Sequence, residues 1–350
     1  MKAFAYAERW GHEEIVLVRD ARSGLRAIIA MHDTTFGPAI GGTRMRVYPS
    51  EDDALLDALR LAKAMTYKCA MAQMRYGGGK AVIVGDPARD KTEARLTAYA
   101  RLVERLGGRF HTGTDMGLDE RDIEVMSRVT RYATHTAAGA SIDSADLAAL
   151  GVFASIERTA QVLDRPLRGL RVAIQGLGEV GRRLARQLAE AGARLTVADI
   201  AAARVGHAVS VWGAAAVTPD AIYDVDADVF SPNAAGGVLC EATIRRLRCR
   251  AVVGAANEQF ADDGAGEALH ARGILYAPDY VVNAGGLLSV LFETGALDEH
   301  GVTARVRGIA DTLGEVWRRA QAEGAPPHRI ADRIVEERLG AARAARREGT

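Results

Sequence analysis

The stretch Gly176-Leu177-Gly178-Glu179-Val180-Gly181 decides the fold that the sequence predicts. It follows an apolar segment, residues 170–175, and begins a segment, 178–191, whose apolar residues recur at helical spacing. A strand, a glycine-rich turn and a helix in this order bind the pyrophosphate of a dinucleotide at the helix N-terminus. Gly176 permits the turn, Gly178 lets the backbone approach the phosphates, and Gly181 lets the helix pack on the sheet. Glu179 and Val180 complete this predicted cofactor site.

An acidic residue strengthens this interpretation. Asp199 ends the next predicted strand, residues 195–198, and follows Gly181 by 18 residues. A carboxylate at this position accepts hydrogen bonds from the ribose hydroxyls and repels a 2′-phosphate, so we expect NAD rather than NADP. The alternative is a glycine-rich turn in an α/β protein that binds no nucleotide, and the context disfavours it.

Strands and helices alternate along most of the chain. Short strands are expected at 229–230, 251–253 and 274–276, each followed by a turn and a helix, which predicts a doubly wound parallel sheet. A length of 350 residues favours two domains. We expect an α/β substrate and catalytic domain over 1–140 and a Rossmann dinucleotide-binding domain over 141–325. A final helix, about 325–350, is free to pack on the first domain.

The composition excludes several classes of partner. The chain has 45 Lys and Arg against 45 Asp and Glu, so it has no general attraction to nucleic acid or anionic membranes. No apolar run approaches the ~18 residues of a membrane span. Three cysteines are too few for a disulfide framework, which favours a cytoplasmic location. The eight histidines show no metal-binding spacing, so no metal site is expected.

A second glycine-rich motif, Gly77-Gly78-Gly79-Lys80, places an amine at the start of a strand expected over 81–84. Lys68 ends the long helix that precedes it. Two ammonium groups held close together in a desolvated cleft would lower one pKa and make one lysine a base near neutral pH. A glycine turn beside a solvated lysine explains the spacing equally well.

Three further loops carry polar residues near predicted strand ends. Asp115 lies in the loop 112–117, where it is either a catalytic carboxylate or a helix cap. The segments 254–257, with Ala256 and Asn257, and 283–286, with Asn283, suit close approach to a nicotinamide or a substrate. Ordinary tight turns remain the alternative for both.

Taken together, these motifs resemble those of the Glu/Leu/Phe/Val amino acid dehydrogenases, and most closely the phenylalanine and leucine branches. The resemblance covers nearly the whole chain. It includes the dinucleotide motif and the following five stretches: 37–44 (GPAIGGTR), 65–68 (MTYK), 77–80 (GGGK), 112–117 (TGTDMG) and 276–286 (YAPDYVVNAGG).

This resemblance implies NAD-dependent, reversible oxidative deamination of an L-amino acid to a 2-oxo acid and ammonia. It implies that Lys68, with the turn Gly41-Gly42, holds the substrate carboxylate and that Lys80 is the general base. Asp115 would exchange protons with the amine. The family also implies a homo-oligomer and a cleft between the two domains that closes on both ligands.

The resemblance also implies which residues select the substrate side chain. The pocket positions fall on Ile40, Gly113, Leu287 and Val290. Gly113 makes room for an aromatic ring, so we expect a hydrophobic or aromatic amino acid, with selectivity of only ~1–3 kcal/mol per methylene.

The sequence departs from the family pattern at several positions near the ligands. Glu258 stands where the family has Asn, and we expect it to pair with Lys68 in the free enzyme. Ala148 replaces a threonine, and the run from Ala138 to Ile142 differs as well. Two alternatives therefore stay open: a diverged imine or amine oxidoreductase of a specialised pathway, and a catalytically weak regulatory paralogue.

Overall fold

A computed structural model describes residues 3–133 and 142–348. The chain forms two compact units: unit 1 spans residues 1–141 together with 335–350, and unit 2 spans residues 142–334. The expected domain boundary at 140 and the family departure at 138–141 lie outside the described residues. Both units are α/β, as the sequence predicts, and each is built around its own sheet.

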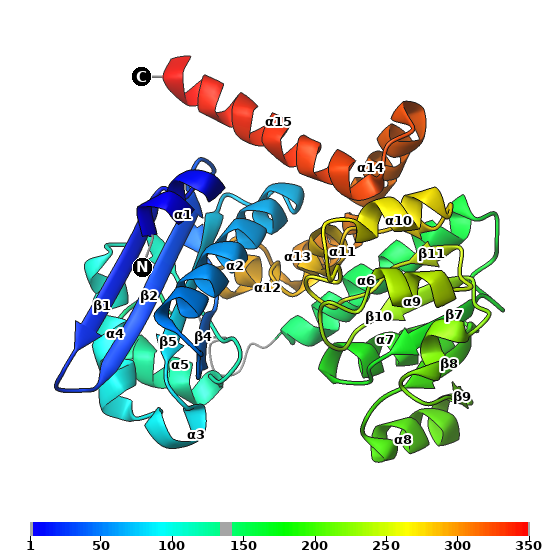
Figure 1. Cartoon of the computed structure of the whole chain (residues 1–350), viewed down its shortest axis with the longest axis horizontal. Coiled ribbons are helices and arrows are strands. Elements are labelled where there is room, and N and C mark those ends of the chain that lie inside the picture. Colours follow the sequence, from blue (N-terminus) through cyan, green and yellow to red (C-terminus); the bar gives the residue numbers. More distant parts are fainter. Residues whose placement is uncertain (1–2, 134–141, 349–350) are drawn as a thin grey trace. The chain divides into compact units, whose positions relative to one another are not determined.

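The sheet of unit 1 is mixed, with the strand order β1-β2-β5-β3-β6 and β4 paired to β5. Figure 1 labels β1, β2, β4 and β5 of this sheet. β1 and β2 form an antiparallel hairpin around residues 21–24, and β2 pairs antiparallel with β5. The remaining pairs are parallel. The strands are β1 (Glu14–Asp20), β2 (Leu25–Asp33), β3 (Ala39–Ile40), β4 (Thr43–Arg46), β5 (Gly77–Val84) and β6 (Phe110–His111).

The glycine run that precedes Lys80 is not a turn, and Lys80 does not lie at a strand start: both expectations are wrong. β5 begins at Gly77, so the run forms its first half. A Cβ at Gly78 would overlap the backbone and hydroxyl of Thr66, and one at Gly79 would press into the ring of Phe110. The glycines therefore let β5 pass between the helix on one face and the packed side chains on the other.

Helices cover both faces of this sheet. α2 (Glu51–Met71) begins at Ser50, whose side chain accepts a hydrogen bond from the N–H of Asp53 at 3.1 Å. Leu55 and Leu59 of α2 pack against one face of the sheet, while Tyr99 and Ile123 belong to the core on the other face. The further helices are α1 (Ala3–Trp10), α3 (Pro87–Asp90), α4 (Glu93–Arg105) and α5 (Glu120–Ser127).

The sheet of unit 2 is parallel, with the order β12-β11-β10-β7-β8-β9. The order reverses beside β7, which confirms the predicted doubly wound fold. Its strands are β7 (Arg171–Gln175), β8 (Arg194–Ala198), β9 (Ala215–Ala216), β10 (Val229–Pro232), β11 (Ala251–Val252) and β12 (Leu275–Tyr276).

Helices alternate with the strands of unit 2. α6 (Ser144–Val162) precedes β7, and α7 (Glu179–Glu190) lies between β7 and β8 in the chain. The others are α8 (Ala202–Trp212), α9 (Glu241–Arg246), α10 (Ala265–Ala271), α11 (Asp279–Val282), α12 (Ser289–Glu293), α13 (Glu299–Arg307) and α14 (Ile309–Glu323), with short 3₁₀ helices η1 (Ala221–Asp224) and η2 (Asn283–Gly285). No helix among residues 3–133 and 142–348 has the length and apolarity to cross a membrane.

The last helix, α15 (Pro327–Glu348), begins in unit 2 and continues into unit 1. In unit 1, Arg338 donates to the carbonyl of Ala70 at 2.9 Å, at the C-terminus of α2. The hydroxyl of Tyr67 donates to Glu336 at 2.6 Å. These bonds fix the last turn of α2, the turn that carries Lys68.

Candidate active site

Lys80 lies in the middle of β5 and is only 7% exposed. Its ammonium group donates a hydrogen bond to Asp115 and forms an ion pair with it. Burial lowers the pKa of Lys80, Asp115 opposes this shift, and the positive charge of Arg44 adds to it, with a net lowering. A lysine with a lowered pKa is suited to accept a proton near neutral pH.

Asp115 lies in the loop before α5, and its side chain is 17% exposed. Burial by itself would raise the pKa of Asp115, but Lys80 and Arg44 beside it lower the pKa below its ordinary value. The carboxylate is therefore ionised at neutral pH. Asp115 does not cap α5. The N-cap of that helix is Asp119, whose side chain accepts a hydrogen bond from the N–H of Arg121 at 3.0 Å.

The turn Gly41-Gly42 joins β3 to β4 and brings these strands against the Lys80–Asp115 pair. A Cβ at Gly41 would overlap the carbonyl oxygen of Gly79, and one at Gly42 would overlap that of Thr114. The two glycines thus allow a close approach of three backbone segments. This packing alone explains why both residues are glycines. The expected binding of the substrate carboxylate by this turn remains a prediction.

The other expected substrate residues are divided between the units. In unit 1, Lys68 lies in the last turn of α2 and Ile40 is buried in β3. Gly113 accepts a hydrogen bond from the N–H of Thr43 at 2.9 Å. In unit 2, Val290 is buried in α12 and Leu287 lies two residues before the start of that helix. The structure therefore brings Ile40 and Gly113 to the sheet that carries Lys80, in unit 1.

Arg44 is a residue of this site that the sequence analysis missed. Its Nε donates to Asp115 at 3.3 Å and its Nη1 donates to Asp57 at 3.0 Å. The sequence analysis assigned the cationic neighbour of Lys80 to Lys68, and the structure adds Arg44, whose positive charge lowers the pKa of Lys80. Its place in the stretch 37–44, two residues after the glycine pair, was the available signal.

In unit 2, the glycine-rich turn follows β7 and leads directly into α7. Gly176 has φ +91°, a left-handed conformation that favours glycine. A Cβ at Gly181 would overlap the carbonyl oxygen of Gly176, so α7 packs directly on the turn. A Cβ at Gly178 would have no heavy atom within 4 Å among the described residues. The backbone at Gly178 is thus open to a phosphate, while Glu179, Val180 and Gly181 form the first turn of α7.

Asp199 stabilises this turn through hydrogen bonds to its backbone. Its carboxylate accepts from the N–H of Leu177 at 2.6 Å and from the N–H of Ala201 at 2.7 Å. Arg204 lies 3.7 Å from the same carboxylate. Asp199 therefore ends β8 beside the glycine-rich turn, at the position expected of a ribose-binding acid.

The loops after β11 and β12 bring the other expected cofactor residues together. Asn283 donates to the carbonyl of Ala255 at 3.2 Å and to the side chain of Asn257 at 2.8 Å, and Ala256 between them is buried. The side-chain oxygen of Asn283 is buried, and no described group donates to it. A buried acceptor without a donor fits an amide-bearing ligand such as nicotinamide.

Glu258, next to this cluster, adopts φ +52°, which is uncommon for a residue other than glycine, Asn or Asp. Its N–H donates to the carboxylate of Asp279. Lys68 belongs to unit 1 and Glu258 to unit 2. The expected pairing of these two side chains thus stays a prediction.

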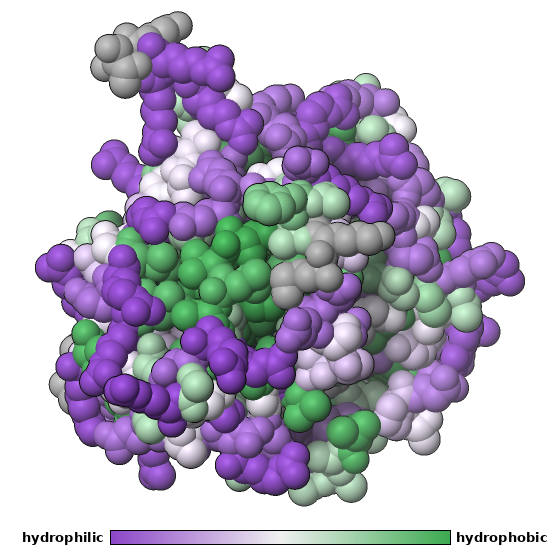
Figure 2. Space-filling view, turned by 60° about the vertical axis from the view of Figure 1, so that its left-hand side comes forward, coloured by the Kyte–Doolittle hydropathy of each residue, from purple (hydrophilic) through white to green (hydrophobic). Residues whose placement is uncertain are grey.

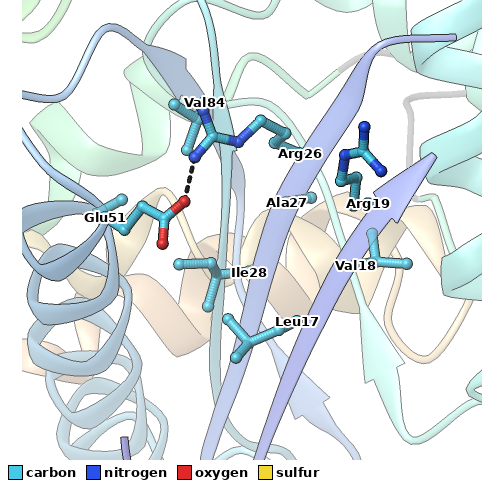
Figure 3. Close-up of a pocket in the computed structure, with 9 residues that line it drawn as sticks. Leu17, Val18, Arg19, Arg26, Ala27, Ile28, Glu51 and Val84 are labelled. Carbon is cyan, nitrogen blue, oxygen red and sulfur yellow. Dashed lines mark hydrogen bonds and ion pairs between the residues drawn. The ribbon is translucent and has the colours of Figure 1, made fainter. Parts of the chain in front are cut away.

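Unit 1 also has an apolar groove apart from Lys80. It has a volume of about 230 Å³ beside the edge strand β1 and includes Leu17, Ile28 and Val84. Arg26 reaches toward Glu51 of α2 and forms an ion pair at the rim (Figure 3). Figure 2, which turns the side with β1 forward, shows apolar surface in a hollow framed by hydrophilic side chains.

The fold and the two sites define an α/β oxidoreductase with a doubly wound cofactor unit. The family model described as Glu/Leu/Phe/Val dehydrogenase, dimerisation domain, matches residues 12–132. The model described as Glutamate/Leucine/Phenylalanine/Valine dehydrogenase matches residues 197–347. The chain belongs to the Glu/Leu/Phe/Val dehydrogenase family, and it is an amino acid dehydrogenase.

Individual relatives cover almost the whole chain. The leucine dehydrogenase of Thermoactinomyces intermedius is 42% identical over 97% of this chain and 94% of its own length. The phenylalanine dehydrogenase of the same organism is 43% identical over 96% and 93%. The crystal structure of L-tryptophan dehydrogenase from Nostoc punctiforme matches with a TM-score of 0.86 at 38% identity, covering 97% of this chain and 99% of that one.

Proposed function

We propose that this protein catalyses the NAD-dependent, reversible oxidative deamination of a hydrophobic or aromatic L-amino acid to its 2-oxo acid and ammonia. The observation that carries the proposal is the buried ion pair of Lys80 with Asp115, in which the pKa of the lysine is lowered. The named relatives, which are leucine, phenylalanine, valine and tryptophan dehydrogenases, support this range of substrates.

In the proposed reaction, the residues of unit 1 handle the substrate. Lys68 binds its carboxylate, together with the backbone at Gly41 and Gly42. Asp115, which is ionised, takes a proton from the substrate ammonium group, because only a neutral amine can become an imine. Neutral Lys80 would then take a proton from the water that attacks the iminium carbon, which gives a carbinolamine. Asp115 would return its proton to the amine nitrogen, and ammonia would leave with the hydroxyl proton as the carbonyl of the 2-oxo acid forms.

The residues of unit 2 would hold the cofactor. The open backbone at Gly178 and the first turn of α7 would bind the pyrophosphate, and Asp199 would bind the ribose hydroxyls. Ala256, Asn257 and Asn283 would face the nicotinamide, which accepts the hydride from the substrate Cα when it is bound. The Asp199 carboxylate would repel a 2′-phosphate, which favours NAD.

One departure from the family pattern, Glu258, favours a second substrate class. Glu258 in place of the family Asn places a carboxylate near the expected substrate carboxylate. This substitution favours a substrate with an extra donor or without a free carboxylate, such as a cyclic imine or an amine. A regulatory paralogue without catalytic activity would not need Lys80 and Asp115, so the presence of both residues argues against that possibility.

One experiment separates these possibilities. NADH and NADPH formation is measured with a panel of L-amino acids and amines, and the reverse reaction with the 2-oxo acids and ammonia. We expect turnover with phenylalanine or leucine and NAD, and a fall in kcat of roughly 10²–10⁴ in Lys80→Ala, the usual effect of removing a positioned base. Turnover of amines alone would favour the second class, and no turnover of any substrate would contradict an enzymatic role.

We further propose a homo-oligomer in which the groove beside β1 contacts a second copy. β1 is an edge strand, and its outward side has no partner strand among the described residues. Such edges are templates for strand pairing between chains. The family model over this unit is described as a dimerisation domain.

The three cysteines are free thiols, which suits the expected reducing cytoplasm.

A further inference from the structure

Arg44 lies between two carboxylates and links the Lys80–Asp115 pair to a second ion pair. It comes from β4, whose register places Arg44 opposite Val82 on the strand of Lys80. Its guanidinium donates to Asp115 on one side and to Asp57 of α2 on the other. The side chains of Arg44 and Asp57 are only 15% and 11% exposed. Both charges are therefore weakly screened by water.

The contacts of Asp57 hold the guanidinium in place. The hydroxyl of Tyr48 donates to Asp57 at 2.7 Å, and Arg60 donates to its other oxygen at 2.9 Å. Four polar contacts thus converge on one buried carboxylate, with Arg44 supplying two of them. This arrangement orients the Nε of Arg44 toward Asp115 rather than toward solvent.

The charges explain what this orientation achieves. Asp115 accepts from Lys80 through one oxygen and from Arg44 through the other. When Lys80 loses its proton, Asp115 still faces one positive charge, so no unpaired buried carboxylate results. Without Arg44, deprotonation of Lys80 would leave Asp115 buried without a cation, and the pair would retain its proton to a higher pH.

We propose that Arg44 is a positioning residue for this reaction: it holds Asp115 and allows Lys80 to act as a neutral base near neutral pH. This inference rests on the proposed function of Lys80 and Asp115. The charged groups that act most strongly on Lys80 in the described structure include Asp115 from the loop before α5, Arg44 from β4 and Asp57 from α2. Arg44 does not need to touch the substrate in this role.

The test is the pH dependence of kcat/KM in Arg44→Gln and Arg44→Lys. Arg44→Gln removes the charge, so the acid limb of the profile should move up by about one pH unit or more, and activity at pH 7 should fall about tenfold. Arg44→Lys retains the positive charge, so the pH of its acid limb should lie close to that of the wild type. A residue that only supported the fold would lower activity without moving the limb.

Two matched controls separate this role from general effects of arginine removal. Arg46→Gln changes an exposed arginine on the same strand, and Arg60→Gln removes another arginine that donates to Asp57. Both should leave the acid limb within a few tenths of a pH unit of the wild-type limb.

The rate of reductive methylation of Lys80 by formaldehyde, followed against pH by mass spectrometry, gives a second readout without substrate or cofactor.

An acid limb at the wild-type pH in Arg44→Gln, or the same shift in Arg44→Lys, would overturn the inference. If Arg44→Gln does not fold, Arg44→Met, which has a similar length and no charge, is compared with Arg44→Lys by the same two readouts. The activities of Lys80→Ala and Asp115→Asn distinguish failure of the Arg44 inference from failure of the proposed function. If those variants keep their activity, the proposed function itself is wrong, whatever Arg44→Gln does.

Discussion

Glu258 combines an unusual backbone conformation with an unusual side chain for its position. Its φ of +52° lies in the left-handed region, where Asn is several-fold enriched and Glu is not. Glu258→Asn should therefore stabilise the protein by up to about 1 kcal/mol. It should also lower KM for L-phenylalanine or L-leucine roughly ten- to a hundredfold, because an amide donates to a carboxylate that Glu would repel.

The two effects are measured separately, by thermal unfolding and by steady-state kinetics. Asp164→Asn, at another non-glycine residue with positive φ, is the matched control, since φ there is +53°. It should change stability alone. An unchanged or raised KM in Glu258→Asn would show that Glu258 points away from the substrate.

At the scale of one element, β5 depends on having no side chains at its N-terminal half. Gly78→Ala would push a methyl group into the backbone and hydroxyl of Thr66 on α2. Since backbone atoms cannot move aside cheaply, we expect a loss of roughly 1–3 kcal/mol in the free energy of unfolding, as for other overpacked cores. Lys80 would shift with its strand, so kcat should fall as well.

The control for this prediction is a glycine in open space. Gly206 lies in the exposed part of α8, where an added Cβ meets no described heavy atom within 4 Å. Gly206→Ala should stabilise the helix by roughly 0.5–1 kcal/mol. Urea unfolding of both variants checks the pair. Equal stability of Gly78→Ala and the wild type would contradict the packing argument.

At the scale of the whole molecule, buried histidines set the response to acid. The rings of His12 and His32 lie 4.8 Å apart, and His32 bonds to Thr66 and to the carbonyl of Trp10. Burial, with a smaller effect of His32, lowers the pKa of His12 from 6.5 to about 4. Because the folded state disfavours the charged ring, the contribution of His12 to the stability of unit 1 is fully present above pH 6.5 and is lost as the pH falls toward 4.

The shift of His12 corresponds to about 3 kcal/mol across this range. Urea unfolding at pH 7.5, 6.0 and 4.5 measures it. His12→Leu should flatten the dependence, whereas His300→Gln, at an exposed position, should leave it as in the wild type. A stability that is as steep in His12→Leu as in the wild type would assign the acid response to other groups.

Assembly is the second property of the whole molecule that can be tested. Leu17 of the groove is 46% exposed in the single chain, so Leu17→Glu should not unfold unit 1. If the groove contacts a second copy, this variant should sediment as a smaller species at micromolar concentration, because a buried unpaired charge costs several kcal/mol. Val211→Glu, at an exposed valine of unit 2, is the control. Wild-type assembly in Leu17→Glu would place the interface elsewhere.

The sequence determined those features whose signal is local. The strand, the turn and the helix around Gly176 are read from adjacent residues, and each follows from steric and periodic rules that need no distant contact. The same holds for the alternation of strands and helices that predicts the doubly wound sheet of unit 2. The motifs around Lys80 and Asp115 also pointed to these two residues, although not to their surroundings.

Only the tertiary structure decided what surrounds them. β3 and β6 have two residues each and β4 has four, too few for any period to show. β3 and β4 depend on pairing with β5, and β6 depends on pairing with β3. Whether the glycine run formed a turn or a strand depended on what packed against it, namely Thr66 and Phe110. Arg44 lies 71 residues from Asp115 and 13 from Asp57, and only the register of β4 on β5 brings the three charges together. Pattern in the chain fixes local conformation, whereas the pKa of a buried lysine depends on charges that the fold gathers from distant segments.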